Sequence, residues 1–252
     1  MEEVKEKIRV SAVSYVNSYP FIYGLRNHDV LREIDLQLDT PAECASKLIN
    51  GEVDLGLVPV AIIPQLKEAH VVTNLCIGSD GPVDTVCLFS HVPLNEIETV
   101  LLDYQSRTSV QLVQLLAQKH WNISPKWMDG SKDFISEIGG TTAGVVIGDR
   151  VFEHEQKFPV VKDLSEEWKT LTGLPFVFAC WVSNKPLNSD FILNFEKALS
   201  QGVENKTQSI AELHGSVNAS LVRYVEESIS YHLDDKKRQA MKLFHAWLST
   251  SP

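Results

Sequence analysis

The chain has 252 residues, of which 44% are hydrophobic and 22% charged, and its formal net charge is −10. This length and composition are typical of one large globular domain or of two smaller lobes, and they exclude a disordered or fibrous protein. The negative balance argues against nucleic acid and anionic membrane surfaces as partners.

The first seven residues, MEEVKEK, carry charges of both signs and lead into an apolar run that is too short for a signal peptide or a membrane span. The four cysteines are widely spaced, lie among apolar neighbours and form no C-x-x-C pair. We therefore expect buried thiols in a reducing compartment. Together these features predict a cytoplasmic protein. The cysteines are Cys44, Cys76, Cys87 and Cys180.

Short apolar runs alternate with helical patterns along most of the chain, which indicates βα units and a mainly parallel sheet. The expected strands span residues 8–14, 34–39, 53–58, 70–75, 85–90, 99–103, 143–147 and 176–182. The clearest helix follows the second strand, where Thr40 is the expected N-cap, Pro41 the first helical residue and Glu43 the partner in a capping box. From residue 189 onward, helical patterns dominate.

The long apolar strands at residues 85–90 and 176–182 flank a central block that has its own alternation of strands and helices. This arrangement predicts two lobes with two crossings between them: residues 1–90 and 183–252 in one lobe, and residues 91–182 in the other. Proteins of this kind bind small molecules in the cleft between their lobes. Because the chain is acidic overall, a small anion needs a locally positive pocket.

Five polar segments lie at the ends of expected strands, where open α/β sheets place ligands. They are residues 14–20 (SYVNSYP), 79–82 (SDGP), 106–109 (SRTS), 148–149 (GD) and 172–175 (TGLP).

The segment 106–109 combines three hydroxyls with the Arg107 guanidinium at an expected helix N-terminus, where backbone N–H groups favour an anion such as a carboxylate. Plain N-capping by Ser106 or Thr108, with Arg107 in solvent, explains the same residues. Asn17 is equally compatible with a turn or capping role, and Asp149 with an N-cap.

Several other kinds of site find no support in the sequence. The eight histidines show no metal-ligand spacing, and none lies in the five polar segments. The chain also has no G-x-S-x-G, P-loop or G-x-G-x-x-G pattern, so hydrolase, nucleotide and dinucleotide functions are not indicated. We expect neither a metal nor an organic cofactor.

The polar segments, taken in order, resemble the chorismate dehydratase family. The resemblance rests on residues 14–20, 51–59 (GEVDLGLVP), 79–83 (SDGPV), 102–103 (LD) with 106–109, 146–149 (VIGD), and Trp168 with 172–176 (TGLPF). It implies an α/β fold of the type II periplasmic-binding-protein-like class, with two lobes and mixed, mainly parallel sheets. Two departures stand out: Thr85 replaces the more common Ser, and residues 60–65 (VAIIPQ) replace a continuation that usually contains an acidic residue.

The resemblance implies a lyase that converts chorismate to 3-[(1-carboxyvinyl)oxy]benzoate, in the futalosine route to menaquinone. Asn17 and Asp149 are the expected catalytic residues. The expected substrate-binding residues are Ser14, Tyr15, Ser18, Ser79, Asp80, Gly81, Thr85, Ser106, Arg107, Thr108, Ser109, Thr172 and Gly173.

Dehydration needs a base for the ring C3 proton, and two mechanisms stay open. In one, Asp149 or Asp80 takes the proton. In the other, which we favour because the matching loops offer few bases, the enolpyruvyl carboxylate of the substrate takes it, and Asn17 orients the ring or the leaving hydroxyl. Arg107 is expected to hold one of the two substrate carboxylates.

Two alternative functions remain. The same fold class is mostly used for reversible binding, so a cytoplasmic small-anion binding module is the first. The related 1,4-dihydroxy-6-naphthoate synthases are the second, but their first loop runs roughly Ser-Pro-Cys-Pro-Asn-Asp, whereas this chain has SYVNSYP at residues 14–20. A monomer and a homodimer are both compatible with the sequence.

Overall fold

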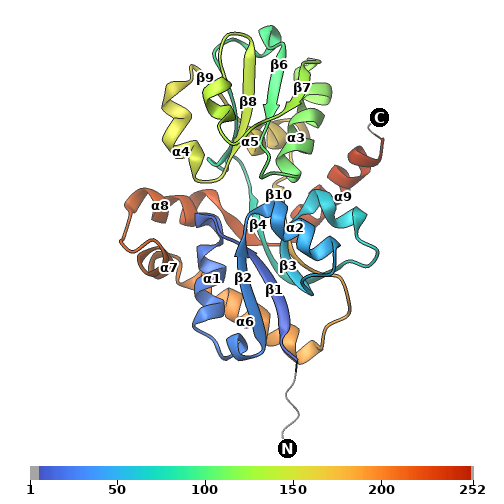
Figure 1. The fold of residues 1–252 in the computed structure, drawn as a ribbon, viewed down its shortest axis with the longest axis vertical. Helices are drawn as coiled ribbons and strands as arrows, with labels where there is room; N and C mark the ends of the chain where they lie inside the picture. The colour runs from blue at the N-terminus through green and yellow to red at the C-terminus, as the bar shows by residue number, and fades with distance from the viewer. Residues whose placement is uncertain (1–5, 251–252) are drawn as a thin grey trace, which may run out of the picture. The chain divides into compact units, whose positions relative to one another are not determined.

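The structure, a computed structural model, describes residues 6–250, and these form two compact units (Figure 1). The first unit contains residues 6–77 and 179–233, and the second contains residues 78–178 and 234–250. The chain therefore passes from one unit to the other after Ile77, after Phe178 and after Leu233. Within the described residues, no helix is long and apolar enough to cross a membrane. Residues 1–5, which include most of the charged N-terminal segment, lie outside the described part of the chain.

These bounds differ from the expected ones at three places. The second crossing lies after Phe178 and not after Val182. Strand β5 (Val86–Ser90), expected to cross between lobes, instead pairs with β8 (Thr142–Ile147) and β9 (Val160–Asp163) inside the second unit. The C-terminal helix α9 (Asp235–Thr250) also belongs to the second unit. Its Phe244 ring packs edge-on against Trp168 and Phe176, with centroid distances of 6.1 and 5.3 Å. The segment that enters the second unit first is therefore the end of β4 (His70–Ser79).

The first unit is built on a six-stranded sheet with the order β11-β4-β10-β3-β1-β2. Strand β1 pairs in parallel with β2 and β3, and β10 pairs antiparallel with β3. The strands not yet bounded are β1 (Ile8–Val13), β2 (Ile34–Asp39), β3 (Leu55–Pro59), β10 (Phe176–Ser183) and β11 (Ser230–His232). The helices are α1 (Tyr19–Arg26), α2 (Pro41–Ile49), α6 (Ser189–Glu204), α7 (Lys206–Leu213) and α8 (Ala219–Arg223).

The predicted capping box is present at the start of α2. The Thr40 hydroxyl accepts from the Glu43 N–H at 3.4 Å, and the Glu43 carboxylate accepts from the Thr40 N–H at 2.8 Å. Two otherwise unpaired backbone donors are thereby satisfied, which fixes where the helix begins.

Helices α1 and α6 cross at two glycines. A Cβ atom at Gly24 would overlap the carbonyl oxygen of Ala198, and one at Gly202 would overlap that of Pro20. Only glycine permits backbones to approach this closely. Pro20 lies at the start of α1, so the crossing also fixes the end of the loop that follows β1.

The second unit is built on a five-stranded sheet with the order β7-β6-β8-β5-β9. Strand β6 (Thr99–Leu102) pairs in parallel with β7 (Lys126–Asp129) and with β8, whereas β5 pairs antiparallel with its neighbours. Helices α3 (Thr108–Leu116), α4 (Arg150–His154) and α5 (Leu164–Thr172) follow β6, β8 and β9 in turn.

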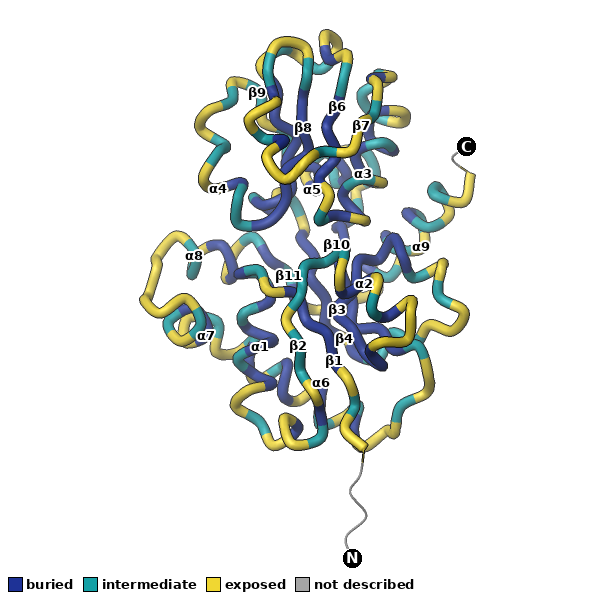
Figure 2. Tube along the Cα trace, in the orientation of Figure 1, coloured by how far each residue is buried: buried dark blue, intermediate teal, exposed yellow. Residues whose placement is uncertain are grey.

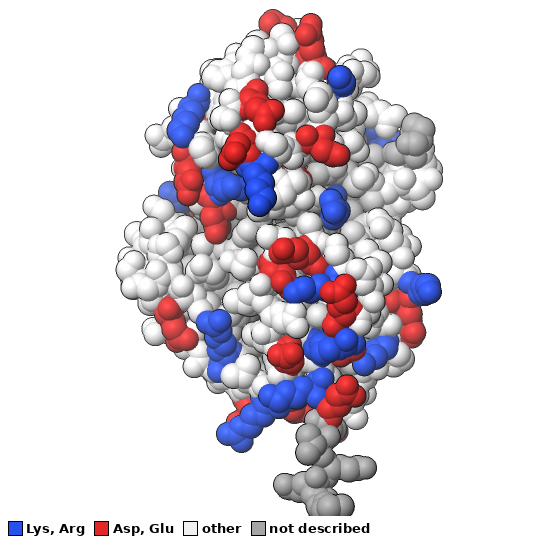
Figure 3. All heavy atoms as spheres, in the orientation of Figure 1, with Lys and Arg blue, Asp and Glu red and all other residues white. Residues whose placement is uncertain are grey.

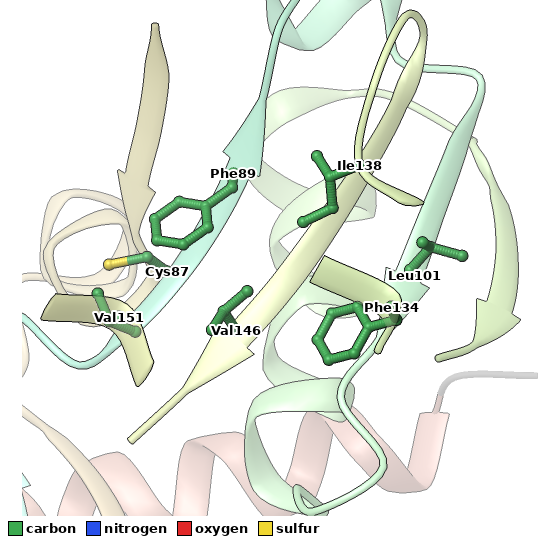
Figure 4. Close-up of a cluster of buried hydrophobic side chains, with 7 residues drawn as sticks. All are labelled: Cys87, Phe89, Leu101, Phe134, Ile138, Val146 and Val151. Carbon is green, nitrogen blue, oxygen red and sulfur yellow. The ribbon is translucent and has the colours of Figure 1, made fainter. Parts of the chain in front are cut away.

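One face of the second sheet carries a cluster of buried side chains, among them Phe89, Phe134 and Val146 (Figure 4). Cys87 also lies in this cluster at 3% exposure, and burial raises the pKa of its thiol well above the ordinary value. Figure 2 shows the central strands of each sheet as buried, whereas much of the outer connections is exposed. Three of the five polar segments therefore follow buried strands, since β1, β6 and β8 lead into residues 14–20, 106–109 and 148–149.

Candidate active site

The expected site residues are divided between the two units. Ser14, Tyr15, Asn17 and Ser18 belong to the first unit, and the remaining residues belong to the second.

In the first unit, a short 3-10 turn (Val16–Ser18) presents Asn17 after β1. The Ser18 hydroxyl donates to Asn17 Oδ1 at 3.1 Å, and the Tyr231 hydroxyl donates to the Asn17 backbone oxygen at 2.9 Å. No hydrogen bond joins the Asn17 amide nitrogen, Nδ2, to the described residues. Asn17 is thus held at two oxygen atoms while its side-chain N–H donors stay available.

The neighbours of Asn17 take structural roles. Ser18 is fully buried, and its hydroxyl serves Asn17. Ser14 is exposed, and its hydroxyl donates to the backbone oxygen of Asp39 at 3.3 Å. Tyr15 is half-buried and accepts the Ser18 N–H that closes the turn.

In the second unit, residues 106–109 form the N-terminus of α3. Ser106 Oγ accepts from the Ser109 N–H at 3.0 Å, and Thr108 Oγ1 donates to the Phe178 backbone oxygen at 3.1 Å. The capping explanation is therefore correct for Ser106, and the Thr108 hydroxyl faces the protein interior. Arg107 is exposed, and its side chain makes no hydrogen bond or ion pair within residues 6–250. The guanidinium stays available to an anion.

Asp103 joins this segment to the loop after β8. Its buried carboxylate accepts from the Gln105 N–H at 3.0 Å, from the Ile147 N–H at 3.0 Å and from Arg150 Nη2 at 2.5 Å. Arg150 also donates to Gln105 at 3.0 Å. A buried carboxylate is stable only with such partners, so the two loops are held as one piece.

Asp149 lies at the N-cap position of α4, half-buried, with its Oδ1 atom out of solvent. Gly148 before it has φ = 70°, a left-handed conformation that glycine adopts at no cost. The Gly148 N–H donates to the Thr85 backbone oxygen at 2.9 Å. This hydrogen bond brings Thr85 and Asp149, two of the expected residues, beside one another.

The segment 79–85 is fastened along helix α5. Ser79 Oγ and Ser165 Oγ are 2.6 Å apart, and Asp80 forms an ion pair with Lys169. Ser79 and Thr85 are each 1% exposed, so their hydroxyls are not at the surface. Gly81 has φ = 132°, and a Cβ there would meet only open space.

Asp163, the N-cap of α5, accepts four backbone N–H groups. Its Oδ2 takes those of Val83 and Asp84, at 2.8 and 2.7 Å, and its Oδ1 takes those of Ser165 and Glu166, at 2.9 and 3.1 Å. Burial raises the pKa of Asp163 to about 6, although each of these donors favours the ionised form.

Thr172 and Gly173 end the same helix. Thr172 Oγ1 donates to the Trp168 backbone oxygen at 2.8 Å and accepts from the Leu174 N–H at 3.1 Å. Gly173 is the left-handed C-cap, with φ = 72°. Helix termination accounts for both residues.

Asp103, Asp163 and Tyr231 were not among the expected site residues, yet all three hold expected ones in place. A signal for Asp163 was present, because an Asp followed three residues later by Glu166 is typical of a helix start. The partner of Tyr231 is 214 positions away in the chain, and no local pattern indicates such a contact.

On the face that Figure 3 draws, Lys and Arg side chains are interspersed with Asp and Glu. This face therefore presents no broad basic patch that would attract anions by its overall charge.

A family model described as menaquinone biosynthesis matches residues 8–250. The chain belongs to this family. It is 27% identical over 255 aligned positions to a chorismate dehydratase of Thermus thermophilus, covering 91% of each chain.

Solved structures show the fold. A protein of Archaeoglobus fulgidus aligns with a TM-score of 0.77 and 14% identity over 98% of both chains. A Candida albicans protein, described as having the generic periplasmic binding protein fold, aligns with a TM-score of 0.66 and 14% identity over 98% of this chain and 92% of that one. The alkanesulfonate-binding protein SsuA of Xanthomonas axonopodis pv. citri, bound to MOPS, aligns with a TM-score of 0.63 and 14% identity over 96% of this chain and 91% of that one. The predicted periplasmic-binding-protein-like fold is confirmed.

Proposed function

We propose that this protein is a chorismate dehydratase that produces 3-[(1-carboxyvinyl)oxy]benzoate, the first step of the futalosine route to menaquinone. The observation that carries the proposal is the span of the family match, since residues 8–250 include both units and every candidate site residue. The dehydratase relative also aligns over nine-tenths of both chains.

The availability of Arg107 supports a carboxylate substrate. Its guanidinium is unengaged within the described residues, and it lies at the N-terminus of α3, where the helix dipole adds to the attraction. We assign one carboxylate of chorismate to Arg107. An Arg–carboxylate pair of this kind is strong and directional.

We assign the second carboxylate to residues 80–81. The Val83 and Asp84 N–H groups are already bonded to Asp163, so they are not free for a ligand. Gly81 leaves open space beside its backbone, and Lys169 offsets the charge of Asp80.

The reaction removes the C3 proton and the C4 hydroxyl of the substrate ring. The electron pair of the C3–H bond becomes the third ring double bond, the C4–O bond breaks, and the hydroxyl leaves as water with the abstracted proton. Aromatisation drives the step. The Asn17 side-chain N–H donors have no partner among residues 6–250, so we assign them the orientation of the departing hydroxyl or the ring.

We propose that the enolpyruvyl carboxylate of the substrate takes the C3 proton. Asp80 is engaged with Lys169, which leaves Asp149 as the carboxylate of the expected site that competes with this assignment. Replacing Asp149 and Asp80 singly by Asn decides between them. We expect kcat losses below about 10⁴-fold, and a larger loss with intact binding would identify a protein base instead.

Incubation with chorismate, followed by ultraviolet spectra and chromatography, tests the function itself. We expect the dienyl chromophore to be replaced by that of a benzoate. Saturable binding of chorismate without conversion would favour the small-anion binding module. Conversion of a naphthalenoid precursor instead would favour the naphthoate synthase alternative.

The cytoplasmic location and the oligomeric state, monomer or homodimer, stay predictions. The described cysteines are free and buried, as a reducing compartment requires. Cell fractionation and light scattering of the purified protein test these two points.

A further inference from the structure

One short helix, α5, contacts the segment 79–85 at three successive points. Ser165 bonds Ser79, Lys169 pairs with Asp80, and Asp163 accepts the Val83 and Asp84 N–H groups. The segment is therefore fastened at its beginning and near its end by the first two turns of the same helix and its N-cap.

The conformation that α5 holds is an unusual one. Asp84 has φ = 64°, which is a left-handed backbone conformation that a non-glycine residue adopts reluctantly. Both N–H groups that donate to Asp163 Oδ2 come from this bend, at 2.8 and 2.7 Å. Short hydrogen bonds to a half-buried carboxylate offset the cost of such a conformation.

The bend leads directly into the expected site. Thr85 follows Asp84, and its backbone oxygen accepts the Gly148 N–H that precedes Asp149. Gly81, where we place a substrate carboxylate, lies between the Ser165 and Asp163 attachments. A change at Asp163 should therefore shift Gly81 and Thr85, which are among the residues expected to bind the substrate. Asp163 itself acts through backbone N–H groups and does not contact the substrate.

We propose that Asp163 is a positioning residue for catalysis, which shapes residues 79–85 to receive a substrate carboxylate. The inference rests on the proposed function for its catalytic consequence. The attachment of the segment to α5 stands on the contacts alone.

The substitution Asp163→Asn separates the two roles of this carboxylate. Asn is a good N-cap, so its single oxygen keeps the Ser165 and Glu166 N–H groups and the start of α5. Its NH₂ group then faces the Val83 and Asp84 N–H groups, donor against donor. The segment is released while the helix stays capped.

Steady-state kinetics with chorismate measure the consequence. We expect Asp163→Asn to raise KM by about tenfold, as the loss of hydrogen bonds to a charged group predicts, with a smaller change in kcat. Glu166→Gln is the matched control, because that side chain is exposed on the same helix, and its kinetics should equal those of the wild type. Ser165→Ala, which removes the Ser79 attachment, should raise KM to a lesser extent.

Amide hydrogen exchange measures the attachment of residues 83–84 to Asp163 without any substrate. In Asp163→Asn, we expect faster exchange at residues 83–84 and unchanged exchange within α5. Unchanged exchange at residues 83–84, or a loss confined to kcat and thermal stability with KM unaltered, would overturn the inference. Failure of the wild type to convert chorismate would instead refute the proposed function and, with it, the catalytic role of Asp163.

Discussion

We expect Arg107 to bear most directly on substrate affinity, because it is exposed and its side chain is uncommitted within the described chain. Arg107→Ala removes a charge-assisted pair worth about 1.5–3 kcal/mol, so KM for chorismate should rise by about 10- to 100-fold. Lys126→Ala is the control, since Lys126 is exposed on β7 of the same unit, and it should leave KM unchanged. Equal effects of the two substitutions would remove Arg107 from the site.

Tyr231 supports Asn17 from a distance in the sequence. Its ring is buried, 5.3 Å from that of Phe21, and its hydroxyl donates to the Asn17 backbone oxygen. Tyr231→Phe removes only that hydrogen bond, about 1 kcal/mol, so kcat should fall several-fold with little loss of stability. Tyr23→Phe, on α1, is the control. A kcat equal to that of the wild type would show that Asn17 needs no such support.

Asp163 also makes stability depend on pH. Its pKa of about 6 in the folded protein lies above the ordinary 3.8, so the folded protein holds this proton more tightly than the unfolded chain. The contribution to the free energy of unfolding is full below about pH 4 and is lost as pH rises through about 6, a change of about 3 kcal/mol. Its titratable neighbours are Cys87 on β5, Asp84 in the bend and Glu166 on α5.

Urea unfolding of the wild type and of Asp163→Asn measures this contribution. As pH falls from about 8 to about 4.5, the free energy of unfolding of the wild type should rise relative to that of Asp163→Asn. The comparison cancels the other titrating groups. A difference that is the same at both pH values would contradict the assignment.

At the scale of elements, the crossing of α1 and α6 depends on Gly24 and Gly202. Gly24→Ala or Gly202→Ala inserts a methyl group against a backbone carbonyl that cannot move aside, which should destabilise the protein by about 1–3 kcal/mol or more. Gly139→Ala is the control, since nothing lies within 4 Å of its added Cβ. Thermal unfolding measures the effect, and equal melting temperatures for all three variants would refute the close packing.

Elements with strong local signals were predictable from the sequence. Strand β2 has the expected bounds, and α2 begins at the expected Thr40 cap, because alternation and capping depend on neighbouring residues. Strands β7, β9 and β11 were missed. They are three or four residues long and only partly buried, so they carry little apolar pattern and depend on pairing with strands elsewhere in the chain.

The candidate site was predictable as a set of loops but not as a set of contacts. The sequence located the polar segments at strand ends, and Arg107 is as accessible as expected. The sequence also suggested that the Ser79 and Thr108 hydroxyls face a ligand. In the structure, the Ser79 hydroxyl is hydrogen-bonded to Ser165 and the Thr108 hydroxyl to the Phe178 backbone oxygen. Serine and threonine satisfy internal and external partners equally well, so only tertiary structure separates the two.

At the scale of the whole molecule, the net charge of −10 limits how an anionic substrate is attracted. A net negative charge repels a dianion, so we expect binding to depend on Arg107, on the N-terminus of α3 and on backbone N–H groups. The affinity of this protein for chorismate should therefore depend less on salt concentration than the affinity of a protein that binds anions through an extended basic surface.

Chorismate deuterated at C3 tests the central claim most directly. Dehydration across C3 and C4 predicts that the purified protein converts it to 3-[(1-carboxyvinyl)oxy]benzoate and that mass spectrometry finds no deuterium in the product, because the C3 label leaves in the step that forms the aromatic ring. Recovery of unchanged chorismate, or a product that retains the label, would contradict the proposed reaction.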